Sequence, residues 1–76
     1  MSEATVVAII RKNSLEEVRV SISEFRGHKL VDVRVFADFD GSGGEPRPTK
    51  KGVALKVELL PDLIAALRAA QEASSR

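Results

Sequence analysis

Apolar and polar residues alternate along two neighbouring segments of the chain, 18–25 and 29–36. Because successive side chains of a strand point to opposite faces of a sheet, each alternation predicts a strand with one apolar and one polar face. Two aromatic rings fall on the predicted polar face, which carries Arg19, Ser21, Ser23, Phe25, Asp32, Arg34 and Phe36.

Two further strands are predicted on either side of this pair. The segment 5–11 is apolar at both parities, which is typical of a strand that is covered on both faces. A glycine-containing loop over 38–46 precedes another alternation at 50–55. Gly52 falls on the polar face of this last strand, which indicates a bulge or a close approach of the backbone.

The hydrophobic period becomes helical from about Glu58. Apolar residues recur at the spacing of one helix face: Leu60, Leu63, Ile64, Leu67 and Ala70. Pro61 is tolerated in the first turn, where its missing N–H has no partner within the helix. Such a stripe more often packs on the helix's own sheet, and dimerisation through the helix is the alternative.

The order of these elements predicts a single α+β domain over residues 1–76. The sheet is expected over 5–55 and the C-terminal helix over 57–73. A chain of 76 residues buries only a modest fraction of its surface, and small cores often gain stability by oligomerising. We therefore expect a homodimer.

The predicted hairpin concentrates basic and aromatic side chains. Its turn, Phe25-Arg26-Gly27-His28-Lys29, contains one glycine suited to a positive φ, and we expect Phe25 and Lys29 to lie close together there. A second basic stretch contains Arg47, Lys50 and Lys51. Aromatic rings stack unpaired bases and cations hold phosphates, so this pattern favours single-stranded nucleic acid. The alternative is that each phenylalanine belongs to the edge of the core or to a dimer contact.

The charge distribution restricts any such surface to a local stripe. The formal net charge is only +1, and ten of the twelve Lys and Arg residues lie between Arg11 and Lys56, interspersed with acids. An ordinary surface of mixed charge is the alternative interpretation.

Other classes of function find little support. The chain has no cysteine and a single histidine, His28, which argues against a metal centre or a catalytic triad. The segment 38–43 resembles part of an EF-hand loop, but its twelfth position is Thr49 instead of glutamate. We expect no enzymatic activity and no cofactor.

The apolar run Val6–Ile10 is too short for a signal sequence or a membrane span, so we expect a cytoplasmic protein, associated with the nucleoid if it is bacterial.

Three motifs in register resemble the positive cofactor four family of transcriptional coactivators, in the form of a short, bacterial-type member. They are Ser23-Glu24-Phe25-Arg26-Gly27, Leu30-Val31-Asp32-Val33-Arg34 and Pro48-Thr49-Lys50-Lys51-Gly52-Val53-Ala54-Leu55, within a resemblance that spans about Val18 to Leu67. The resemblance implies a curved four-stranded antiparallel sheet followed by a helix (ββββα), a homodimer, and binding of single-stranded DNA without marked sequence preference. The residues that we assign to nucleic acid are Phe25, Arg26, His28, Lys29, Arg34, Phe36, Arg47, Lys50 and Lys51.

The chain departs from the family pattern at three positions. Ala37 replaces the second aromatic residue at the end of a strand, and Phe39 is a candidate substitute. Glu16 stands at a basic position, and His28 replaces a lysine of the turn. Binding is therefore expected to be weaker than in the family or more dependent on pH.

The leading functional hypothesis is a single-strand-binding homodimer that serves transcription or DNA maintenance. The same aromatic face in a protein–protein module, contacting the transcription or repair machinery, is a second hypothesis. A single-stranded RNA binder is a third, because stacking and phosphate contacts serve both polymers.

Overall fold

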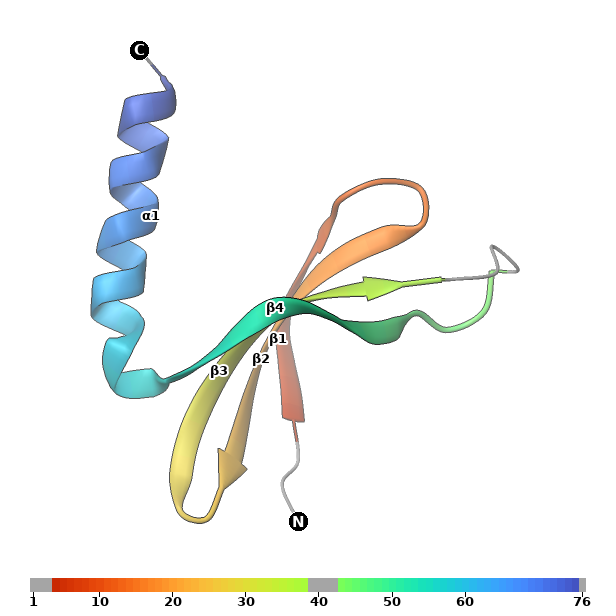
Figure 1. Cartoon of the computed structure of the whole chain (residues 1–76), viewed down its shortest axis with the longest axis horizontal. Coiled ribbons are helices and arrows are strands. Elements are labelled where there is room, and N and C mark those ends of the chain that lie inside the picture. The colour runs from red at the N-terminus through yellow and green to blue at the C-terminus, as the bar shows by residue number, and fades with distance from the viewer. Residues whose placement is uncertain (1–3, 39–42, 76) are drawn as a thin grey trace.

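Four antiparallel strands in chain order and one C-terminal helix make up the fold of this computed structural model (Figure 1). The structure describes residues 4–38 and 43–75. The sheet order is β1-β2-β3-β4, and each strand extends beyond the segment that was predicted for it. The elements are β1 (Ala4–Arg11), β2 (Glu16–Phe25), β3 (His28–Ala37), β4 (Arg47–Lys56), a 3-10 turn η1 (Val57–Leu59) and α1 (Leu60–Ser74).

Strands β2 and β3 form a hairpin closed by a two-residue turn. Phe25 pairs directly with His28, so that the turn consists of Arg26 and Gly27 alone. Their φ angles are 53° and 79°. Positive φ at both central residues is the geometry of a type I′ turn, whose twist matches that of the flanking strands. Gly27 adopts this geometry without steric cost, whereas Arg26 does so less readily.

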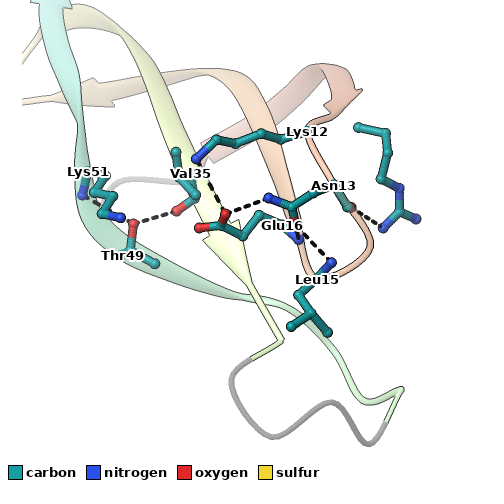
Figure 2. Close-up of polar contacts among 8 residues, drawn as sticks. Lys12, Asn13, Leu15, Glu16, Val35, Thr49 and Lys51 are labelled. Atoms are coloured by element: carbon teal, nitrogen blue, oxygen red, sulfur yellow. Dashed lines mark hydrogen bonds and ion pairs between the residues drawn. The ribbon is translucent and has the colours of Figure 1, made fainter.

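Strand β4 bulges between its pairs with Arg34 and Phe36. Thr49 stabilises this bulge, because its hydroxyl donates to the carbonyl oxygen of Val35 at 2.8 Å and accepts the N–H of Lys51 at 3.1 Å (Figure 2). The extra residues displace the basic stretch of β4 from regular alternation.

Gly52 follows the bulge and lies against the backbone of β3. A Cβ atom at this position would lie 2.5 Å from the carbonyl oxygen of Val33 and 2.8 Å from the Cα of Arg34. Neither neighbour is the movable end of a side chain, so only glycine fits without a shift of backbone. The close approach predicted from the sequence is confirmed.

The helix α1 stands away from the sheet and follows β4 through the short turn η1 (Figure 1). Ile64 is 48% exposed and Leu67 is 60% exposed, although both belong to the apolar stripe. The expectation that this stripe packs on its own sheet is wrong for the single chain. The physical reason is the connection, since one 3-10 turn after the edge strand β4 leaves no segment that can reverse the chain over the sheet.

Strand β1 is also uncovered, because it forms the edge of the sheet opposite β4 and α1. All eight of its residues are exposed, including Val7 and Ile10. The expectation of a strand covered on both faces therefore fails within one chain.

Val31 and Ala37 are the buried hydrophobic residues of the described chain. The radius of gyration is 14.2 Å, against about 11 Å for a compact domain of this length. The isolated chain thus leaves most of its apolar surface without a partner.

Within residues 4–38 and 43–75, no helix is long and apolar enough to cross a membrane.

Candidate nucleic-acid interface

The strand register gathers the predicted polar residues on one face of the sheet. Arg19 lies opposite Arg34, and Ser21 lies opposite Asp32, in agreement with the alternation of the sequence. Phe25 and Phe36 belong to this same face but lie at opposite ends of the hairpin. Phe36 pairs with Glu17, and the eight positions along β2 from Glu17 to Phe25 span about 27 Å. The two rings therefore offer separate contact points.

Phe25 presents an exposed ring at the tip of the hairpin. Its exposed fraction is 53%, and the guanidinium carbon of Arg26 lies 5.1 Å from the ring centroid. His28 lies directly across the ladder from Phe25. We call Phe25, Arg26 and His28 the hairpin-tip cluster. It combines a π-face with an adjacent cation, which is the chemistry of base stacking and phosphate contact.

Lys29 does not join this cluster. It pairs with Glu24, one position farther along each strand, and so points to the face opposite Phe25. The expectation that Phe25 and Lys29 lie close together is therefore wrong. The two-residue turn places His28, and not Lys29, opposite Phe25.

Phe36 is less accessible than Phe25 because an arginine covers it. The guanidinium of Arg19 lies 4.4 Å from the centroid of the Phe36 ring and is ion-paired with Glu17. Arg19 was not among the predicted site residues. The alternation of the sequence already placed Arg19 on the same face as Phe25, which was a reason to consider it. That Arg19 covers Phe36 follows only from the pairing of β2 with β3. A guanidinium plane itself offers a surface on which a base can stack.

Arg34 is held by an acid of its own strand. Its Nε and Nη2 donate to the two carboxylate oxygens of Asp32 at 3.0 and 2.9 Å, and its Nη1 donates to the carbonyl oxygen of Thr49 at 3.0 Å. The hydrogen-bonded carboxylate of Asp32 raises the pKa of Arg34. With three of its five N–H groups engaged, Arg34 fixes β4 against β3 and retains two donors for a ligand.

Glu16 contacts the side chains of Asn13 and Lys12 near the end of β3 (Figure 2). Its Oε1 accepts a hydrogen bond from the Asn13 side-chain amide at 2.7 Å and lies 3.3 Å from the Nζ of Lys12. These two bonds, with the positive charges of Lys12 and Lys51, lower the pKa of Glu16. The acid thus offsets part of the positive charge that Lys51 contributes.

Arg47 and Lys50 are exposed on β4, and no ion pair joins either to another described residue. Arg47 pairs with Ala37 at the end of the sheet opposite the hairpin tip. We call Arg47, Lys50 and Lys51 the β4 cluster. The hairpin-tip cluster and the β4 cluster thus lie at the two ends of the sheet, with Arg47 on the face opposite Phe25. The other predicted site residues, Lys29, Arg34 and Phe36, belong to neither cluster.

Phe39, the candidate replacement for a second aromatic residue, lies outside the described residues. So does most of the segment that resembles an EF-hand loop. The described part of the chain contains no group of three metal-ligating side chains.

Comparison with known proteins decides the family. The sequence profile described as Transcriptional Coactivator p15 (PC4) matches residues 12–66. The chain belongs to this family. This is the positive cofactor four family that the sequence motifs resemble, and it is one of transcriptional coactivators, which confirms the expectation that the chain is not an enzyme.

Two solved structures of the family share this fold. The PC4 homologue BPSL1147 from Burkholderia pseudomallei, in its orthorhombic crystal form, is 31% identical with a TM-score of 0.79, covering 91% of this chain and 90% of that chain. The bacteriophage T5 homologue, described as implicated in recombination-dependent DNA replication, is 26% identical with a TM-score of 0.72, covering 96% of this chain and 82% of that one.

Curated relatives are longer proteins. An RNA polymerase II transcriptional coactivator of Drosophila melanogaster is 49% identical over 45 residues, which cover 58% of this chain and 38% of that protein. The coactivator SUB1 of Saccharomyces cerevisiae is 39% identical over 46 residues, which cover 60% of this chain and 15% of that protein. The present chain thus matches less than half of either relative.

Proposed function

We propose that this PC4-family protein binds single-stranded DNA as a homodimer, without marked sequence preference, and serves transcription or DNA maintenance. The observation that carries the proposal is the exposed Phe25 ring, with Arg26 beside it, on the polar face of an open sheet. Stacking requires only a π-face, so any unpaired base meets the requirement, whereas paired bases of a duplex do not offer theirs.

Phosphate contacts come from the exposed cations. Arg26 lies at the hairpin tip, and the β4 cluster lies at the far end of the same sheet. A strand that reaches from one end to the other passes the pair Arg19–Arg34. Because the net charge of the chain is only +1, this attraction is local and strongly weakened by salt.

Dimerisation follows from the uncovered apolar surface. The accessible surface of the chain is 6085 Å², whereas a folded monomer of this mass exposes about 4,500 Å². The excess is of the order that each subunit buries in an obligate homodimer. The apolar stripe of α1, with Ile64 and Leu67, and the exposed strand β1 supply this surface.

The T5 phage relative is described in connection with recombination-dependent replication, and the fly and yeast relatives with transcription. Both descriptions suit a protein that handles transiently unpaired DNA, and we propose DNA maintenance and transcription as the two settings of this one activity.

Fluorescence anisotropy tests the proposal with labelled single-stranded DNA, duplex DNA and single-stranded RNA of equal length over a salt series. We expect tight binding to single-stranded DNA that weakens steeply with salt, and weaker binding to duplex. Preference for RNA would instead support the RNA-binding hypothesis. Absence of binding to all three would favour a protein–protein module.

A further inference from the structure

Glu17 is the buried charged residue of the described chain, and it lies on the same polar face of the sheet as Phe25. It is only 9% exposed. A carboxylate is rarely buried unless a cation pairs with it. Arg19, two positions farther along β2, is that cation, because its Nε donates to Oε2 of Glu17 at 2.5 Å. This ion pair therefore lies on the surface that the proposed DNA strand crosses.

The ion pair holds the guanidinium of Arg19 over the ring of Phe36. The guanidinium carbon lies 4.4 Å from the ring centroid, which is the separation of a cation–π contact. Phe36 pairs with Glu17 across the β2–β3 ladder, so that the ring and the carboxylate are neighbours. Because Glu17 binds Nε and Phe36 supports one side of the plane, the guanidinium is fixed in one orientation.

The polar face around Arg19 is open. The helix α1 stands away from the sheet (Figure 1), and no described strand or helix forms a second layer over this face. The Arg19 side chain keeps 18% of its surface exposed, although Phe36 and Glu17 both contact it. Bases stack on the planes of arginine side chains as they do on aromatic rings. A guanidinium that is backed by a ring and faces solvent is suited to this contact.

Arg34, which lies directly across the ladder from Arg19, is held in a different way. The carboxylate of Asp32 binds its Nε and Nη2, and the carbonyl oxygen of Thr49 binds its Nη1. No ring of the described residues lies against its guanidinium. Arg34 therefore joins β3 to β4, whereas Arg19 is the arginine at the centre of the face that an aromatic ring supports.

Building on the proposed function, we propose that the guanidinium of Arg19 is a second base-stacking platform and that Glu17 is the residue that positions it. Phe25 and Arg19 lie six positions apart on β2, about 20 Å along the strand. The two platforms therefore hold bases several nucleotides apart on one bound strand. Phe36 acts through Arg19, because it supports the plane from below. Since every base has a π-face, this platform adds affinity without sequence preference.

Arg19→Lys tests the platform, because lysine keeps the charge and the partner Glu17 but has no plane on which a base can stack. Fluorescence anisotropy with labelled single-stranded DNA should show binding about fivefold weaker than in the wild type, the lower end of the loss that follows removal of a stacked base. The slope of log affinity against log salt should stay unchanged, because Arg19 is paired with Glu17 and neutralises no phosphate. Arg68→Lys makes the same exchange on the helix and is the matched control, which should bind as tightly as the wild type.

Glu17→Ala tests the positioning role. Without the carboxylate, Arg19 becomes a mobile cation that reaches a phosphate, so the salt slope should steepen by about 0.7. In this background Arg19→Lys should no longer weaken binding, because the arginine plane is no longer held. A residue that served only the fold would not make the effect of Arg19→Lys disappear. Circular dichroism must show that each variant is folded.

Nuclear magnetic resonance of the wild-type protein supplies a readout that needs no variant. The Nε–H proton of Arg19, assigned through its side chain to the backbone, should move upfield when single-stranded DNA binds. The physical reason is the ring current of the stacked base, which shields a proton that lies over its face.

A folded Arg19→Lys protein that binds single strands as tightly as the wild type would overturn the platform and leave single-strand binding standing. An Arg19 Nε–H resonance that does not move at saturating DNA would also overturn it. A loss of affinity in Arg19→Lys that persists unchanged in the Glu17→Ala background would overturn the positioning role of Glu17. Failure of the wild-type protein to bind single strands would instead overturn the proposed function itself.

Discussion

The guanidinium of Arg26 lies 5.1 Å from the centroid of the Phe25 ring, at the tip of the β2–β3 hairpin. Arg26 occupies the first position of the turn with a φ of 53°, a conformation that asparagine adopts more readily than arginine. Arginine is thus not the residue that this turn favours, but at position 26 it places a cation beside an exposed ring.

Arg26→Asn tests whether arginine serves the ligand or the turn. Asn-Gly is the favoured sequence of a type I′ turn, so we expect the melting temperature to stay the same or rise. Binding to single-stranded DNA should weaken, and the slope of log affinity against log salt should flatten by about 0.7 for one lost phosphate contact. Unchanged binding would show that Arg26 does not contact the strand.

Lys50→Ala tests whether an exposed cation of β4 contacts phosphate. Lys50 is exposed and has no ion pair among the described residues, so its loss should flatten the salt slope by about 0.7, equally on all sequences. Arg68→Ala, which removes the same charge from the helix, is the control and should leave the slope unchanged. Equal effects of the two variants would contradict a specific phosphate contact at Lys50.

Leu67→Asp tests dimerisation through α1. Sedimentation at micromolar concentration should show the wild type at twice the chain mass of 8.2 kDa. Leu67 is 60% exposed in the single chain, so an aspartate there costs little in the isolated subunit but places an unpaired charge in a helix-mediated interface. We expect dissociation of the dimer.

Ala69→Asp is the matched control, since residue 69 lies on the opposite side of the helix from the apolar stripe. It should remain dimeric. A wild-type protein that sediments only as an 8.2 kDa species would contradict the dimer altogether.

Gly52→Ala tests the close approach of β4 to β3. The added methyl group meets the backbone oxygen of Val33 at 2.5 Å, so we expect a loss of about 1–3 kcal/mol in the free energy of unfolding. Denaturant titration at fixed protein concentration measures it. A variant as stable as the wild type would show that β4 can shift without cost.

The alternation of the strands was sufficient to predict the sheet faces, because side-chain direction in a strand depends only on parity. The neighbour of Phe25 was predicted wrongly, since Lys29 and His28 differ by one register position that only the turn geometry fixes. The apolar surfaces of β1 and α1 are uncovered in the single chain, and the prediction that a second chain covers them stays a prediction. Periodicity identifies which residues seek burial, but it does not say whether the covering surface belongs to the same chain.

The sequence also did not predict which arginines of the site are engaged by other groups of the protein. Arg34 and Asp32 are two positions apart on one strand, and the engagement of Arg34 by the carbonyl oxygen of Thr49 depends on the bulge in β4. Arg19 covers Phe36 for a similar reason, because the contact crosses from β2 to β3. Such contacts follow from three-dimensional register, and they decide which cations remain available to a ligand.

The most direct test of the central claim is the affinity of Phe25→Ala for single-stranded DNA over a salt series. The variant removes a stacking surface but no charge, so we expect binding to weaken by about 1–3 kcal/mol while the salt slope stays unchanged. Phe36→Ala should cost less, because Arg19 already covers that ring. Circular dichroism must show both variants folded. A folded Phe25→Ala protein that binds single strands as tightly as the wild type would contradict the account, because the ring would then serve packing and not the ligand.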